Sequence, residues 1–245
     1  MNRLGIPLIC LSLAAYAADA PPGLVRLAAE RESRTEDVRS KYLYKQVVLF
    51  QEIGKSGTRG GEYREQREVI FSPGGERTER MVGKPWNTLA LIRLTDEDFR
   101  DMREVQPMLL TRESLWLYKA ESRGDEIIDT IDCWVISIKP RQILDGQRLF
   151  EGLLWVDKSD YSIIRSEGRA MPQIFKRKEE NLFPRFTTVR KKVEGGFWFP
   201  SVTVSDDVLE FSSGPVRQKM KITYSDYQRF GAESIVKYDA ETKPQ

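Results

Sequence analysis

Alternating apolar and polar positions run through most of the chain after residue 42 and predict β-strands separated by short turns. Glycine-rich turns fall at 54–61 and 74–75, and Glu194-Gly195-Gly196 marks another hairpin. Short turns indicate antiparallel pairing. The predicted strands cover residues 42–52, 62–71, 76–82, 114–122, 125–138, 148–157, 161–170, 185–194, 197–211 and 216–229. The pattern therefore predicts one mainly antiparallel domain of roughly ten strands.

Two segments have helical rather than strand character. Residues 24–42 are rich in helix formers, without Gly or Pro, and predict an N-terminal helix. Thr95 is placed to cap a second helix, with acidic Asp98 three positions later, and Pro107 limits its end. The polar stretch 172–184 is predicted to be a solvated loop or a short helix.

The hairpin at 148–168 departs from simple alternation, because Leu153-Leu154-Trp155-Val156 is apolar at every position. Alternation places Leu149, Leu153 and Trp155 on one face and Phe150, Leu154 and Val156 on the other. A strand that is apolar on both faces must be covered on both. Either helices cover one face and a second sheet the other, or the sheet curls round an apolar cavity that holds a ligand.

The N-terminus predicts export. A short basic start is followed by the apolar run LGIPLICLSLAA and by Ala15-Tyr16-Ala17, which fits a cleavage site. We therefore expect a signal peptide over residues 1–17 and a single domain over residues 18–245. Cys10 could instead be acylated as in a lipoprotein, but the bulky Ile9 before it favours a place in the signal core. Cys133 is expected to be a buried structural thiol.

The composition of the chain mainly excludes classes of function. The chain has 245 residues, 40% of them hydrophobic and 31% charged, which fits a folded domain. A net charge of +2 gives no overall field for nucleic acid or an anionic membrane. The sequence contains no histidine, which excludes Ser-His-Asp and Cys-His catalysis and histidine metal sites. We expect no enzyme activity, no metal and no cofactor.

Carboxylate pairs are the remaining catalytic candidates, since glycoside hydrolysis needs two carboxylates. Asp157 and Asp160 share one turn, and Asp206 and Asp207 lie near the end of a strand. Aspartates are common in turns because their side chains bind local backbone groups. We therefore interpret all four as structural residues.

Bulky apolar residues on the strands are the positive signal for function, although the default role of any one tryptophan is to fill the core. The candidates for an apolar ligand cavity are Leu153, Trp155, Leu154, Val156, Trp134 and Trp198. Residues 86–110 form a candidate lid, because the segment is predicted to be helical and lies among strands, and its methionines could adapt to irregular chains. Its candidate residues are Trp86, Phe99, Met102 and Met108. The alternative is a plain helix that fills the core.

Two stretches resemble the LolA-like outer-membrane lipoprotein-sorting family, the LolA/LolB superfamily. They are Phe150–Asp157 with its return strand Tyr161–Gly168, and Arg190–Ser201. The order of signal peptide, helix, strands, helical insertion and strands is also similar. The resemblance implies an α+β fold that is mainly antiparallel β. This would be an incomplete, half-open β-barrel of about ten or eleven strands, closed by helices.

The resemblance also implies a role. It suggests a monomeric periplasmic carrier that shields the acyl chains of lipids or lipoproteins in an apolar cavity. A regulator of the same architecture is the alternative, sensing envelope stress through a membrane-anchored envelope protein; a purely structural envelope module is a third possibility. The chain is longer than the compact carrier at 172–184, and it lacks the acylation motif of the anchored receptor.

Overall fold

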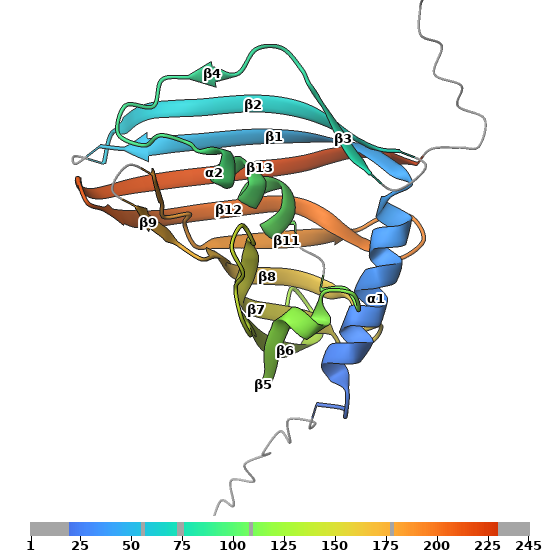
Figure 1. Cartoon of the computed structure of the whole chain (residues 1–245). Coiled ribbons are helices and arrows are strands. Elements are labelled where there is room, and N and C mark those ends of the chain that lie inside the picture. The colour runs from blue at the N-terminus through green and yellow to red at the C-terminus, as the bar shows by residue number, and fades with distance from the viewer. Residues whose placement is uncertain (1–19, 55–56, 73–75, 108–109, 177–178, 230–245) are drawn as a thin grey trace, which may run out of the picture.

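Eleven strands form one antiparallel sheet that does not close on itself (Figure 1). The computed structural model describes residues 20–54, 57–72, 76–107, 110–176 and 179–229. The predicted signal peptide therefore lies outside the described residues. The sheet order is β3-β2-β1-β13-β12-β11-β8-β7-β6-β5, and β4 also pairs with β2. The half-open, mainly antiparallel fold that was expected is confirmed.

The strands are long and mostly joined by tight turns. Their bounds are β1 Tyr42–Ile53, β2 Arg59–Phe71, β3 Arg77–Met81, β4 Trp86–Asn87, β5 Tyr118–Ile128, β6 Ile131–Pro140, β7 Leu149–Asp157, β8 Ile163–Met171, β11 Phe186–Lys192, β12 Trp198–Phe211 and β13 Gly214–Arg229. A separate two-stranded hairpin consists of β9 Ile174–Lys176 and β10 Glu179–Asn181. Most predicted strands are found within a few residues of their expected ends.

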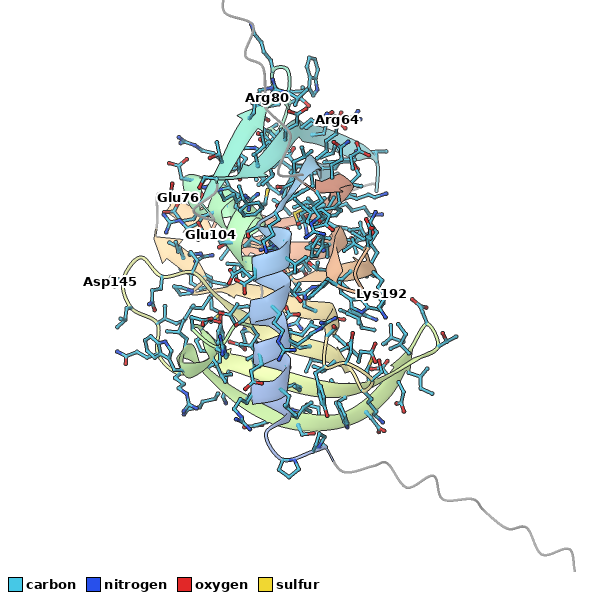
Figure 2. All side chains as sticks on the ribbon, turned by 90° about the vertical axis from the view of Figure 1, so that its right-hand side faces the viewer. Arg64, Glu76, Arg80, Glu104, Asp145 and Lys192 are labelled. Carbon is cyan, nitrogen blue, oxygen red and sulfur yellow. The ribbon has the colours of Figure 1, made fainter. Side chains whose placement is uncertain are left out.

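Helical segments lie on the concave side of the sheet. The first, α1 (Leu24–Arg39), runs across the strand direction at one end of the sheet (Figures 1 and 2). The second combines α2 (Asp96–Arg100) with the π-helical turn η1 (Asp101–Val105), and a short 3-10 turn, η2 (Leu115–Leu117), precedes β5. The predicted helix start at Thr95 is confirmed, because Thr95 and Asp98 form a reciprocal capping box.

A fully buried ion pair fixes α1 to the sheet. Arg190 of β11 donates from Nη1 to both carboxylate oxygens of Glu32, at 3.0 and 2.7 Å, and also to the carbonyl of Ile163. Burial raises the pKa of Glu32, and the Arg190 guanidinium opposes that shift. Neither charged group can lose its partner without leaving a charge in the core.

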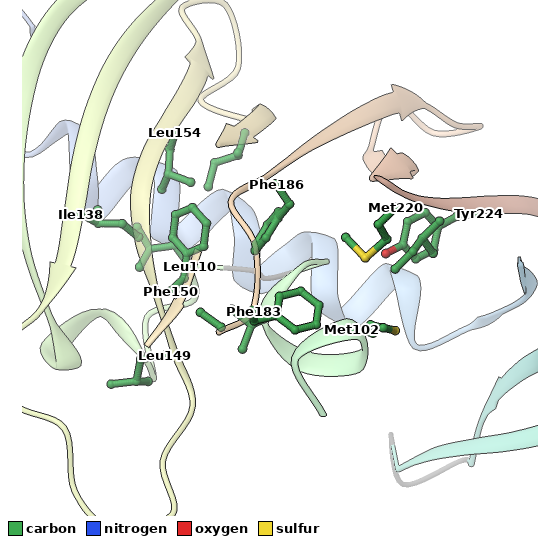
Figure 3. Close-up of a cluster of buried hydrophobic side chains, with 14 of the residues drawn as sticks. Met102, Leu110, Ile138, Leu149, Phe150, Leu154, Phe183, Phe186, Met220 and Tyr224 are labelled. Carbon is green, nitrogen blue, oxygen red and sulfur yellow. The ribbon is translucent and has the colours of Figure 1, made fainter. Parts of the chain in front are cut away.

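The main hydrophobic core fills the concave side, between the sheet and the helical segments (Figure 3). Aromatic rings from three strands and a loop meet there, and Phe150 packs on Phe186 with ring centroids 5.8 Å apart. Met102 and Leu110 enter the same cluster from the segment that the sequence marks as a lid. The core thus joins strands from both halves of the sheet.

The two-sided strand β7 is covered differently on its two faces. Leu154 and Val156 belong to the main core, whereas Trp155 and Leu153 belong to a smaller cluster on the convex face. The predicted split of these four residues is confirmed. Leu149 was placed with the convex set, and that prediction was wrong, because Leu149 packs in the main core. It is the first residue of the strand, where alternation along the strand has only begun.

At Gly152, β7 and β8 leave no room for a side chain. A Cβ at Gly152 would lie 2.1 Å from the carbonyl oxygen of Glu167 and 2.6 Å from the Cα of Gly168, its partner in the ladder. The ring of Phe150 covers the two glycines. The expectation that Gly152 permits a bend or close approach is confirmed.

Two expected segments differ from the structure. The turn between β5 and β6 lies at Asp129-Thr130, both with positive φ, and not near Gly124, which occupies a bulge within β5. Residues 172–184 are neither a solvated loop nor a helix. They form the β9–β10 hairpin, and Leu182 and Phe183 then return to the main core.

Candidate functional site

The segment over residues 95–106, here called the plug, packs into the concave side of the sheet. Met102 and Val105 are buried in the main core, and Phe99 contacts the ring of Tyr63 with centroids 5.6 Å apart. Gln106 accepts a hydrogen bond on its carbonyl from the Thr188 hydroxyl, at 2.9 Å. The plug contains a π-helical turn, a feature that occurs frequently at functional sites.

An almost fully buried ion pair holds the plug in place. Arg148 donates from Nε to Asp101 Oδ1 at 2.8 Å and from Nη2 to Asp101 Oδ2 at 2.5 Å. The same guanidinium donates to the carbonyl of Pro172. Arg148 thus ties the plug to the chain entering β7 and to the chain leaving β8. Removing either partner would leave a buried charge, which is strongly unfavourable.

Two carboxyl groups on the plug have altered acidity. Burial raises the pKa of Asp98 to about 6, although hydrogen bonds from Thr95 oppose the shift. Burial also raises the pKa of Asp101, with Arg148 acting in the opposite direction. The stability of the plug therefore depends on pH in the range just below neutrality.

A pocket of about 440 Å³ lies beside the plug, and we refer to it as the plug pocket. This volume is within the range typical of small-molecule sites. Its apolar wall combines the loop before β7 with the β9 strand, and its polar wall includes Arg100 and Arg148. The apolar lining residues are Ile143, Leu144, Pro172, Ile174 and Phe175. Leu144 and Phe175 are largely exposed, so the apolar wall continues to the surface.

The six predicted cavity residues are divided between the two faces of the sheet. Leu154, Val156 and Trp134 are buried on the concave side in the main core. Leu153, Trp155 and Trp198 lie on the convex face, with Trp155 and Arg165 in cation–π contact at 4.6 Å. The sequence left open which face looks toward the helical segments, and the structure assigns that position to the first set.

The predicted lid residues are also separated. Phe99 and Met102 lie on the plug, and Met108 lies outside the described residues. Trp86 is in β4, paired with Arg64 at the edge of the sheet, and its side chain is 60% exposed. The expectation that the whole segment 86–110 is helical was wrong, because its first part pairs with β2 as a strand.

A polar network on the concave side was missed by sequence reasoning. Arg67 donates to both oxygens of Glu65 at 2.8 Å and to Glu79 at 2.5 Å, while the Tyr63 hydroxyl donates to Glu65 at 2.6 Å. Gln46 accepts a hydrogen bond from Arg77 nearby in the sheet. The concave side is therefore apolar near β6–β8 and mixed near β1–β3, where Val48, Phe50 and Val69 are buried in the main core beside this network. Alternation within β1 and β2 marks these inward positions, but no local signal predicts their pairing.

The aspartates proposed as turn residues have that role. Asp157 accepts from the backbone N–H and hydroxyl of Ser159, and Asp160 accepts from the N–H of Ser162. Asp206 pairs with Arg217 across the β12–β13 ladder. Within the described ranges, no group of three acidic or cysteine side chains is placed to hold a metal ion. In the same part of the chain, no helix has the length and apolarity to cross a membrane.

These features define a class of protein: a half-open antiparallel sheet whose concave side is occupied by a helical plug beside an apolar pocket. Solved structures with similar folds include a DUF1329 family protein from Desulfovibrio piger, which is 14% identical with a TM-score of 0.39; the match covers 86% of this chain and 95% of that one. A LolA superfamily protein from Nitrosomonas europaea is 16% identical with a TM-score of 0.36, over 82% and 92% of the two chains.

The Pseudomonas aeruginosa MucA/MucB complex provides a further match, at 11% identity and a TM-score of 0.25, over 84% of this chain and 99% of that one. No family model matches the chain, and no curated protein matches its sequence. At these identities and TM-scores, the likenesses do not establish a function.

Proposed function

We propose that this protein is a non-enzymatic carrier that binds the acyl chains of a lipid or lipoprotein on the concave side of its sheet. The plug pocket is the observation that carries this proposal. It is apolar on one side, open to the surface, and next to a plug that is held by a buried ion pair, a hydrogen bond from Thr188 and apolar packing. An acyl chain that entered there would reach apolar side chains on the concave side once the plug moved.

In this proposal the concave residues Leu154, Val156 and Trp134 line the interior. Phe99 and Met102 act as the lid, because they belong to the plug, which is the segment that must move. Burial of apolar surface stabilises a complex by roughly 25 cal/mol per Å², or about 0.8 kcal/mol per CH₂ group. Each CH₂ group of an acyl chain that is buried in this way therefore offsets part of the free energy that holds the plug in place.

The sequence supports a setting for this activity. The predicted signal peptide over residues 1–17 favours export, and the resemblance favours the periplasm and outer-membrane lipoprotein sorting. We expect a monomer that does not bind nucleic acid.

The test is lipid analysis of the mature protein expressed with export, by native mass spectrometry, together with binding of a fluorescent acyl probe. Leu144→Asp, in the plug pocket, should weaken probe binding about tenfold or more, since it places a charge on an apolar wall. Ile127→Asp is the control, because Ile127 is also an exposed apolar residue, at 70% against 52% for Leu144, but it lies on the convex face. Absence of both co-purified lipid and probe binding would overturn the proposal.

A convex-face pocket favours a second candidate function, binding of a membrane-anchored envelope protein. This pocket of about 320 Å³ is lined by Ile127, Ile128, Ile164, Val189 and Trp198, among others. The buried indole N–H of Trp198 has no acceptor in the part of the chain that the structure describes. Crosslinking in envelope extracts tests this role: Ile127→Asp should abolish a stoichiometric protein adduct that Leu144→Asp retains.

A further inference from the structure

We propose that the edge of the sheet formed by residues 80–93 is a docking surface for membranes that contain anionic lipids. Residues 82–92, here called the strap, follow β3, cross the outer edge of β2 as β4 and lead to the plug. This docking surface is separate from the plug pocket, and it does not depend on whether the protein carries a lipid.

Large apolar side chains are exposed on the strap. Trp86 is 60% exposed and Leu91 is 63% exposed, and Met81 and Val82 just before them are also exposed. Single exposed apolar residues are normal, but four within eleven positions are a local concentration of exposed apolar side chains. Tryptophan is enriched where proteins meet the membrane–water interface, because its ring is apolar and its N–H is polar.

The strap is held rigidly, so this exposure does not arise from a loose loop. The buried carboxylate of Glu52 accepts three backbone N–H groups from the strap, those of Ala90 at 3.0 Å, Leu91 at 2.6 Å and Ile92 at 2.6 Å. Gly61 lets the strap approach closely, since a Cβ there would lie 2.1 Å from the Thr88 carbonyl oxygen. A preorganised surface loses little conformational entropy on binding.

The charges around the strap complement an anionic surface. Residues 80–95 contain three basic residues, Arg80, Lys84 and Arg93, and no acidic residue. Arg64 lies beside Trp86 in the ladder, and Figure 2 shows Arg64 and Arg80 at the same end of the molecule. Arg64 pairs with Glu62 at 2.7 Å. Arg80 pairs with Glu68, but Lys84 and Arg93 have no ion-pair partner among the residues that the structure describes.

The same basic residues favour a membrane, rather than a second copy of this chain, as the partner of this docking surface. A second copy of this chain would bring a matching set of basic residues to the contact, and like charges would repel. A bilayer that contains anionic lipids offers both an apolar layer for Trp86 and Leu91 and a negative surface for Lys84 and Arg93. Each basic residue near such a surface contributes roughly 1 kcal/mol, about fivefold in affinity at low salt. The net charge of +2 on the whole chain conceals this local excess.

The test is co-sedimentation of the mature protein with vesicles of phosphatidylcholine, with and without phosphatidylglycerol. We expect binding only to vesicles with phosphatidylglycerol, with an affinity that falls as salt increases. The pair Trp86→Ser and Leu91→Ser should reduce binding tenfold or more. The pair Lys84→Glu and Arg93→Glu should also reduce it at least tenfold. All four side chains are exposed, so folding should be retained, as circular dichroism would check.

Trp116→Ser is the matched control. Trp116 is 68% exposed, but it precedes β5, at the opposite edge of the sheet. If Trp116→Ser weakens binding as much as the strap variants, or if the protein binds neither kind of vesicle, the proposal is overturned. It is also overturned if the strap variants lose an envelope-protein adduct while vesicle binding is unchanged. Acyl-probe binding by the strap variants should remain normal, which keeps this test separate from that of the carrier.

Discussion

Substitution of Asp98 by Asn should remove a large part of the pH dependence of stability. Burial raises the pKa of Asp98 to about 6 in the folded protein, from an ordinary value of 3.8. A carboxyl group whose pKa is raised on folding favours the folded state when it is protonated. Its contribution is complete below about pH 4 and is lost as the pH rises through 6.

The size of the effect follows from the shift. A difference of about two pKa units, at 1.36 kcal/mol per unit, corresponds to about 3 kcal/mol of stability lost between roughly pH 4 and pH 7. Asparagine keeps an oxygen that can accept the Thr95 N–H bond, which Asp98 accepts at 2.6 Å, but it cannot ionise. The variant should therefore match the parent near pH 4 and exceed it in stability by about 3 kcal/mol above pH 7.

Urea unfolding, followed by circular dichroism at about pH 4 and about pH 7.5, measures this difference. Other buried carboxyl groups, such as Glu32, titrate in both proteins, so their contribution cancels in the comparison. Asp96→Asn is the control, because Asp96 is exposed in the first turn of the same helix. An Asp98→Asn variant with the same relative stability at both pH values would refute the reasoning, as would an equal effect of Asp96→Asn.

Three further predictions concern buried groups. Arg190→Met should lower the free energy of unfolding in urea by about 3–5 kcal/mol, because it leaves the Glu32 carboxylate buried without its partner. Adding Glu32→Leu should restore most of this stability. A double variant no more stable than the single one would contradict this expectation. Gly152→Ala should lower the free energy of unfolding by about 4 kcal/mol or more, because its Cβ would clash with the backbone of β8. Gly54→Ala is the control: its Cβ would lie 3.2 Å from its nearest neighbour, so the change should cost under about 1 kcal/mol. Burial raises the pKa of the Cys133 thiol to about 12, so iodoacetamide should label it only in urea; rapid labelling of the native protein would exclude a buried thiol.

Alternation and turn residues predicted most strands correctly, but they misplaced the turn between β5 and β6, where two turn-like signals compete. Gly124 follows a basic residue within an otherwise strand-like stretch, which favours a turn there. The structure instead uses its φ of 91° for a bulge and turns at Asp129 and Thr130, with φ of 46° and 78°. Positive φ at non-glycine residues is uncommon, so the correct turn carried the weaker signal. The Ile128–Ile131 pair that closes this turn is visible only when the register is known.

The parts of the candidate site that could not be predicted depend on contacts distant in sequence. Asp101 and Arg148 are 47 positions apart, and Glu52 contacts the strap 38–40 positions later. No periodicity links such residues, because their meeting depends on how the sheet curls. By contrast, the two-sided character of Leu153 to Val156 follows from alternation alone, since a strand that is apolar on both faces must be covered on both.

Both edges of the open sheet are protected against pairing with other chains, and this protection bears on function. A sheet with two free edges is prone to pair with other chains. At one edge, β5 presents mostly charged or polar side chains to solvent and is interrupted by the Gly124 bulge. At the other edge, two short strands, β3 and β4, divide the exposed side of β2 between them. Both devices protect the edges without closing the sheet, so the plug movement that we propose would make the concave side reachable. A protein that served only as a scaffold would gain stability from closure; retention of an open, protected sheet favours a role in which something enters.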